Sequence, residues 1–175
     1  MKNQCLTYSA ICAALGTIFL SVGFFLQAAV SLWVFLASIC VMMSLETGRL
    51  RYAVLTHIVI TLLSLIFNGF NFIYMIPYIF FMGICPIFSF MFERTKMPAL
   101  VAYFIKQALF ILSMMIAASF SVVFFNFKPD SFMSVMIIIV LCIPSFFFYN
   151  LGMVNIRKKL RLFMGRKRIN FESEK

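Results

Sequence analysis

Two ionisable side chains, His57 and Lys106, stand inside the long apolar stretches of this 175-residue chain. An enzyme centre within a membrane requires several ionisable or nucleophilic groups gathered at one depth. The apolar stretches contain no Asp or Glu, and the chain has no H-E-x-x-H, G-x-S-x-G or phosphate-binding glycine motif. We therefore expect no catalytic residues and no enzyme activity.

Lys106 is the charge that lies deepest, about 12 Å beyond the polar boundary at Pro98 if the intervening residues are helical. Its apolar stem can carry the ammonium group back toward the interface. Alternatively, the ammonium group points inward and pairs with Glu46, Glu93 or an acid of a partner, because an unpaired charge at this depth costs a few kcal/mol. We interpret His57, near one end of its apolar stretch, as an interfacial histidine with satisfied hydrogen bonds.

Neutral polar residues gather near the ends of other apolar stretches: Gln27, Asn68, Asn71, Tyr74 and Asn126. Each alone is typical of a turn. Together they suit a small-molecule pocket, which combines apolar and aromatic walls with a few hydrogen-bonding groups. We expect nearby prolines to kink the helices and help to open such a cavity; these are Pro77, Pro86 and Pro144.

The composition places all of these residues in a membrane protein. Hydrophobic residues make up 64% of the chain, charged residues 11%, and the mean hydropathy is +1.06. A soluble domain of this length cannot bury so much apolar surface. Six apolar segments have lengths that suit a hydrocarbon core of about 30 Å: residues 6–25, 28–45, 52–67, 72–92, 99–125 and 131–154. The sequence predicts an all-α bundle of six transmembrane helices.

The basic residues predict how this bundle is oriented. If the chain crosses six times, thirteen of the fifteen lysines and arginines fall on the side of the two termini, and Lys128 alone falls on the other. Cytoplasmic loops carry such an excess. We expect both termini in the cytoplasm of a bacterial cell, with a transmembrane domain at residues 1–155 and a basic tail at residues 156–175. The polar residues described above then lie at the outer ends of the helices.

The tail and the cysteines argue against several other functions. Although the net charge is +10, there is no soluble module to track nucleic acid. The stretch "RKKLRLFMGRKR" interleaves basic and apolar residues, so we expect it to lie on the anionic lipid of the inner leaflet. The five cysteines stand singly without C-x-x-C spacing, which indicates neither a metal site nor a redox motif. We expect no cofactor.

Small residues crowd the first segment at "SAICAALG", residues 9–16. Ala10 and Ala14 lie one helical turn apart on one face, beside a second ladder of Ser9, Ala13 and Thr17. Faces of this kind let another helix approach closely within lipid. That helix belongs either to this protein's own bundle or to a partner.

Three stretches resemble a known family: "YSAICAALG", "SLETGRLRYAVLT" and "YIFFMGICPIFSFMFER". They are similar to an uncharacterised branch of the substrate-binding S components of energy-coupling factor (ECF) transporters. The resemblance implies that the protein captures a vitamin or other micronutrient in an outward-facing pocket. It further implies that Ala10 and Ala14 dock a transmembrane coupling subunit, which works with two cytosolic ATPases, while Ser9, Ala13 and Thr17 pack inside the bundle.

A different class of protein has the same general features. The rod-shape-determining membrane proteins of the cell-wall elongation machinery are also small, multi-helical and without catalytic residues. In that alternative, the small-residue face docks a cell-wall partner and the outer polar residues only form turns.

Overall fold

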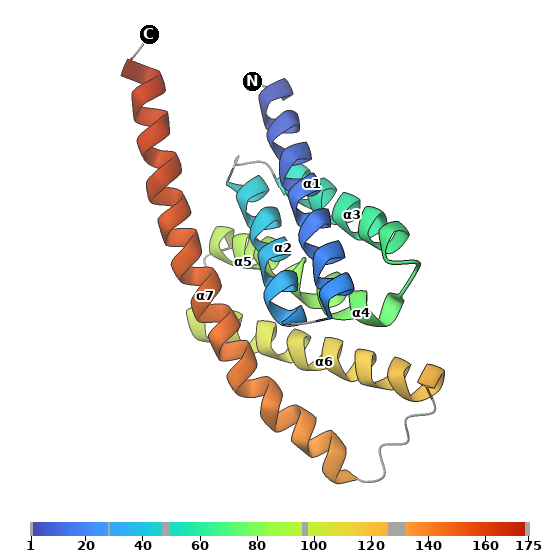
Figure 1. Ribbon diagram of the computed structural model, residues 1–175. Coiled ribbons are helices and arrows are strands. Elements are labelled where there is room, and N and C mark those ends of the chain that lie inside the picture. The colour runs from blue at the N-terminus through green and yellow to red at the C-terminus, as the bar shows by residue number, and fades with distance from the viewer. Residues whose placement is uncertain (1, 28, 47–49, 96–97, 126–131, 174–175) are drawn as a thin grey trace.

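The computed structural model describes residues 2–27, 29–46, 50–95, 98–125 and 132–173 (Figure 1). These ranges contain helices and no strand, which confirms the all-α prediction. In chain order the elements are α1 (Lys2–Leu26), α2 (Val30–Leu45), α3 (Leu50–Phe67), α4 (Phe72–Pro77), the π-helix η1 (Tyr78–Met82), α5 (Cys85–Arg94), α6 (Ala99–Phe125) and α7 (Phe132–Ser173).

Three stretches of the described chain are long and apolar enough to cross a membrane: Gln4–Leu26, Leu50–Phe67 and Tyr74–Arg94. Helix α2 and the stretch Leu100–Ile116 are apolar but shorter. A helix needs about 20 apolar residues to span a bilayer. By length and composition the protein is therefore membrane-embedded, and the count of six crossings stays a prediction.

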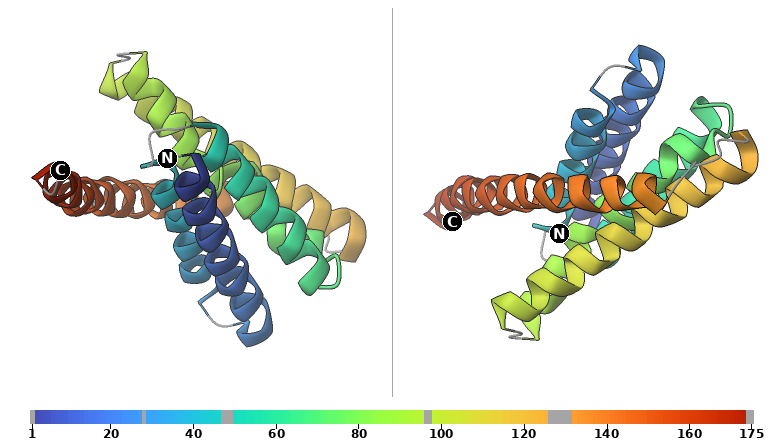
Figure 2. Two further views of the ribbon diagram at one scale, coloured as in Figure 1. Left: turned by 90° about the horizontal axis from the view of Figure 1, so that it is seen from above. Right: turned by 90° about the horizontal axis from the view of Figure 1, so that it is seen from below.

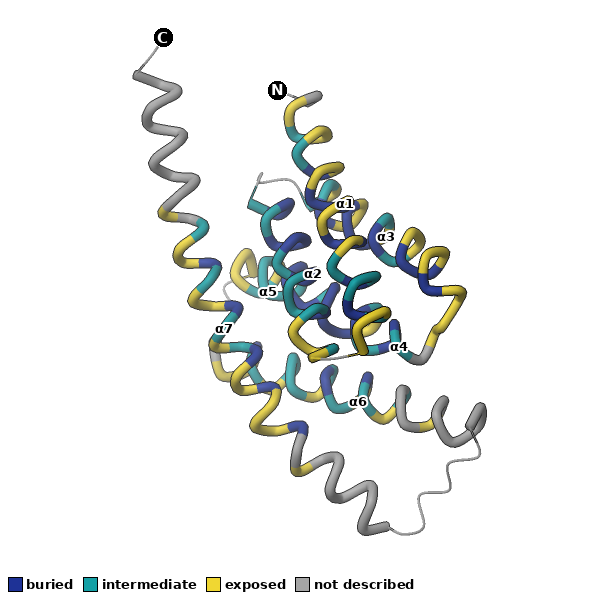
Figure 3. The backbone as a smooth tube through the Cα atoms, in the orientation of Figure 1, coloured by how far each residue is buried: buried dark blue, intermediate teal, exposed yellow. Residues whose placement is uncertain are grey.

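Helix α1 packs against both α2 and α3, and these three helices surround much of the core (Figure 1). Leu20, Val41 and Ile60 are fully buried there. Along α1 and α3 buried residues alternate with exposed apolar ones (Figure 3). Exposed leucines and isoleucines on a helix of this composition are suited to contact with lipid chains.

The fourth apolar segment is a broken helix. Pro77 ends α4, η1 follows, and Pro86 stands in the first turn of α5. Proline removes a backbone donor and clashes with the preceding turn, so the regular hydrogen-bond ladder cannot continue. The carbonyl oxygen of Met82, at the end of η1, accepts hydrogen bonds from the hydroxyls of Ser38 and Tyr149. The predicted interruption at Pro77 and Pro86 is confirmed, whereas Pro144 lies inside the continuous helix α7.

Helix α7 runs without a break across residues 155 and 156, where the sequence predicted that a tail would begin. Seen from below, α7 crosses α6 obliquely (Figure 2). Helix α1 begins and α7 ends at the same end of the molecule (Figure 1). The first basic residue assigned to the tail, Arg157, is buried against the bundle.

Candidate functional site

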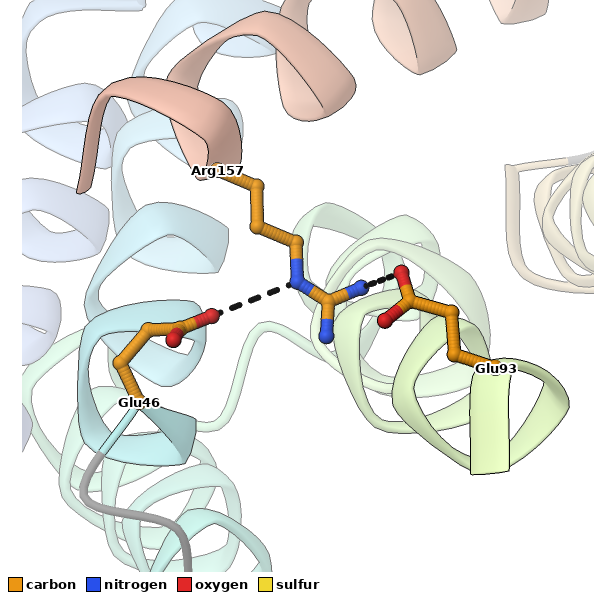
Figure 4. A network of polar contacts seen from close by, with 3 residues as sticks. All are labelled: Glu46, Glu93 and Arg157. Carbon is orange, nitrogen blue, oxygen red and sulfur yellow. Dashed lines mark hydrogen bonds and ion pairs between the residues drawn. The ribbon is translucent and has the colours of Figure 1, made fainter. Parts of the chain in front are cut away.

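An ion-paired cluster joins the ends of α2 and α5 to the interior of α7 (Figure 4). Arg157 of α7 lies between Glu46, which caps α2, and Glu93, in the last turn of α5. Its Nε donates a hydrogen bond to Glu46 Oε1 at 3.3 Å, and its Nη1 donates one to Glu93 Oε1. Each of these residues follows an apolar stretch, so all three sit where a helix leaves the apolar region. The planar guanidinium is suited to hold two carboxylates at once.

The cluster is buried on one side and open on the other. The side chains of Arg157 and Glu46 are 9% and 13% exposed, whereas that of Glu93 is 51% exposed. The guanidinium carbon also lies 6.0 Å from the ring centroid of Phe90. Within the described part of the chain, the buried Nη2 of Arg157 has no hydrogen-bond partner. Since a buried charge is costly unless paired, the buried carboxylate of Glu46 contributes most to keeping this arginine in place, and the half-exposed carboxylate of Glu93 contributes less.

A cavity of about 160 Å³ adjoins the cluster, between α2, α5, α6 and α7. Its polar lining consists of Ser89, Glu93, Lys106, Asn150, Arg157 and Lys158. A larger, more open hollow of about 450 Å³ shares four of these residues and is extended by Phe92, Leu100, Ala102 and Tyr103. We call the first hollow, lined by Lys106, Arg157 and Lys158, the chamber, and the second, lined by Phe92, Leu100, Ala102 and Tyr103, the groove. The two are continuous.

Lys106 lines both hollows beside Glu93. The ion pairs of Glu46 and Glu93 described above run to Arg157, and the pairing of Lys106 with either acid stays a prediction. Arg157 was assigned to a basic tail on the inner leaflet, so its ion pairs were not predicted.

The helical register of α7 contained a signal for Arg157. Its buried residues follow one stripe at helical spacing: Cys142, Phe146, Tyr149, Met153 and then Arg157. Residues spaced three and four apart share a helix face. An arginine that continues such a stripe is placed against the bundle.

The predicted substrate residues gather only in part. Asn71 accepts a hydrogen bond from the backbone N–H of Tyr74 at 3.4 Å, and the Tyr74 hydroxyl donates to the carbonyl oxygen of Leu20, also at 3.4 Å. Asn71 therefore caps α4, and Tyr74 joins this turn to α1. Gln27 is exposed beyond the end of α1, with a φ of 49°. Asn126 lies outside the described residues.

Asn68 is the most buried of these residues, 2% exposed. Its Nδ2 lies 3.7 Å from the sulfur of Met75. In the part of the chain that the structure describes, its buried Oδ1 has no hydrogen-bond partner. Neither hollow near Arg157 is lined by Asn68, and Gln27, Asn71 and Tyr74 do not line them either.

The two small-residue ladders of α1 face in different directions. Ser9, Ala13 and Thr17 are buried, as expected. Ser9 Oγ lies 2.8 Å from Ser44 Oγ of α2, which ties the two helices together. Ala10 and Ala14 are exposed.

His57 differs from its interpretation as a satisfied interfacial residue. It is 9% exposed, its ring lies 5.4 Å from that of Tyr78, and Gly83 packs against the imidazole where any Cβ would clash. No described residue forms a hydrogen bond with its buried Nδ1. The packing of η1 and Gly83 over α3 buries His57 within the bundle, and the sequence of α3 alone does not indicate that contact.

The described residues include no group of three or more His, Cys, Asp and Glu side chains able to hold a metal ion. No family model matches the chain, and neither a curated protein nor a solved structure matches it.

Proposed function

We propose that this protein is the substrate-binding membrane subunit of an ECF-type importer. It captures a vitamin or other micronutrient outside the cell and docks a transmembrane coupling subunit that works with two cytosolic ATPases. The observation that carries the proposal is the exposure of Ala10 and Ala14 on α1.

An exposed pair of alanines is unusual on a helix that faces lipid. Around it α1 exposes bulky side chains: Ile11 is 54% exposed, Leu15 41% and Ile18 54%. Alanine makes fewer dispersion contacts with lipid chains than these residues do, but it lets a second helix approach the backbone closely. Because Ser9, Ala13 and Thr17 already serve packing within the protein, the Ala10 and Ala14 face is left for a partner.

Six crossings with both termini in the cytoplasm belong to the same proposal. Two features support them: the shorter helices are also apolar, and α1 begins at the end of the molecule where α7 ends (Figure 1). The test is labelling of single cysteines in a cysteine-free background by a reagent that cannot cross the membrane. Lys128→Cys is expected to react in intact cells, and Arg51→Cys only after lysis. The reverse pattern contradicts the orientation.

The unpartnered Oδ1 of Asn68 supports a substrate site near the turn between α3 and α4. A buried acceptor without a donor costs about 1–3 kcal/mol. Because this oxygen is covered in the present conformation, a polar ligand that donates to it and recovers this cost binds with the turn opened. Asn68→Leu is therefore expected to abolish thermal stabilisation by the substrate in a micronutrient panel, while association with the coupling subunit is retained. Mass spectrometry of the small molecule that co-purifies with the wild-type protein identifies the substrate.

Docking is tested by co-expression with a coupling subunit and its two ATPases. We expect the complex to co-purify with the wild-type protein and its recovery to fall at least tenfold in the variant Ala10→Leu plus Ala14→Leu, because leucine separates the helices. The matched control is Ala108→Leu, at an exposed alanine of α6, which should leave recovery unchanged. Capture of cell-wall elongation proteins instead, without any ligand-dependent thermal shift, favours the scaffold alternative.

A further inference from the structure

The chamber beside Arg157 carries an excess of positive charge. Three cations line it, Lys106, Arg157 and Lys158, against one carboxylate, Glu93. If Glu46 is counted as well, the cations still outnumber the acids by three to two. The chamber is therefore electrostatically suited to an anion.

The direct partners of such an anion are separate from the ion-paired cluster. Nη2 of Arg157 is covered by neighbouring side chains, so Arg157 acts here through its charge. Lys106, Lys158, Ser89 and Asn150 supply donors on the walls of the chamber. A water occupies about 30 Å³ in the liquid, so a cavity of about 160 Å³ has room for a tetrahedral oxyanion and some water.

The adjoining hollow adds an apolar surface to this anion site. It opens between α5, α6 and α7 and is lined by Phe92, Leu100, Ala102 and Tyr103. Lys106 belongs to both hollows, so the charged and apolar surfaces are continuous. The site also lies where α2 and α5 end, and the ends of membrane-spanning helices stand near the polar headgroups. Basic pockets between transmembrane helices are known to bind anionic headgroups at this depth.

We propose that this chamber and groove form a binding site for a phosphate group carried by an anionic phospholipid. The phosphate lies between Lys106 and Lys158, and an acyl chain follows the groove over Ala102. The site is distinct from the outer substrate site and from the docking face of α1. It does not depend on the transport function proposed above.

Native mass spectrometry of the delipidated full-length protein tests the proposal with three probes: phosphatidylglycerol, zwitterionic phosphatidylcholine and inorganic phosphate. We expect one phosphatidylglycerol to be retained in preference to phosphatidylcholine. Lys106→Gln should weaken this retention roughly tenfold, since it removes a charge-assisted hydrogen bond. The matched control is Arg51→Gln, which removes an exposed charge outside the chamber and should have no effect.

Lys106→Gln is a suitable variant because replacing a charge within an apolar helix does not hinder membrane insertion. A thermal melt of each variant checks that it is folded. A second variant, Ala102→Leu, narrows the groove without changing any charge. It should weaken phosphatidylglycerol retention and leave the binding of inorganic phosphate unchanged, with Ala108→Leu as its control.

The outcomes separate the two sources of phosphate. In one outcome, inorganic phosphate binds as well as the phospholipid, with binding that is weakened by Lys106→Gln and unchanged by Ala102→Leu. This outcome supports the phosphate site and assigns it to a soluble ligand. Equal losses in Lys106→Gln and Arg51→Gln overturn the proposal, because the attraction is then a general effect of net charge. Retention that is unchanged in Lys106→Gln overturns it as well.

Discussion

Replacing Arg157 by Met removes the cation that holds the ends of α2 and α5 against α7, and removing its two acids one at a time should have unequal effects. Glu46 is 13% exposed, and breaking a buried ion pair by removing one partner costs about 3–5 kcal/mol. Glu93 is 51% exposed, and an exposed pair contributes less than about 1 kcal/mol. We expect Arg157→Met to lower the free energy of unfolding by about 3 kcal/mol, and Glu93→Gln by less than about 1 kcal/mol.

The assay is unfolding in mixed micelles with increasing SDS, followed through the fluorescence of Trp33, the sole tryptophan. Arg51→Met is the control for loss of an exposed arginine. The double variant Glu46→Met plus Arg157→Met should recover most of the lost stability, because apolar replacement of a buried pair is often neutral. The reasoning is refuted if Arg157→Met unfolds at the same SDS fraction as Arg51→Met, or if the double variant is less stable than Arg157→Met.

Two further predictions concern the broken helix. Ser38→Ala and Tyr149→Phe should each lower the free energy of unfolding by about 1 kcal/mol. The double variant should lower it by more than the sum of the two single losses, because the carbonyl oxygen of Met82 then loses both of its hydroxyl donors. A double-mutant cycle in the same SDS assay measures this coupling, and strict additivity would contradict it. Gly83→Ala should lower the free energy of unfolding by more than about 1 kcal/mol, because the added methyl group meets the ring of His57 on α3. If this variant unfolds at the same SDS fraction as the wild-type protein, α3 and the segment around Gly83 separate easily.

Much of the fold could be predicted from local sequence. The apolar segment at residues 99–125 coincides with α6, and that at 28–45 with α2 apart from two residues. Hydropathy and the polar residues between segments are local properties, so helix positions follow from them. The interruption at Pro77 and Pro86 is equally local, because proline disrupts a helix beyond its first turn, as at Pro77, and favours the start of a new one, as at Pro86.

The candidate site could be predicted only in part. The register of α1 separates the face of Ala10 and Ala14 from that of Ser9 and Ala13, and the resemblance indicated which face a partner would bind. The capping of α4 by Asn71 is a common local role of that residue. The unpartnered oxygen of Asn68 depends on packing around the turn, and no local pattern indicates it.

The sequence by itself determined that this is a helical membrane protein, where most of its helices run and which of their residues carry charge, but not that α7 continues to Ser173. Only the tertiary structure decided which charges meet. Glu46 and Arg157 are 111 positions apart, and Glu93 and Arg157 are 64 apart. Their meeting depends on the convergence of α2, α5 and α7, and helix neighbours are chosen by packing over the whole bundle rather than by any one segment. The packing of α6 against α5 and α7 likewise places Lys106 on the wall of the cavity beside Arg157.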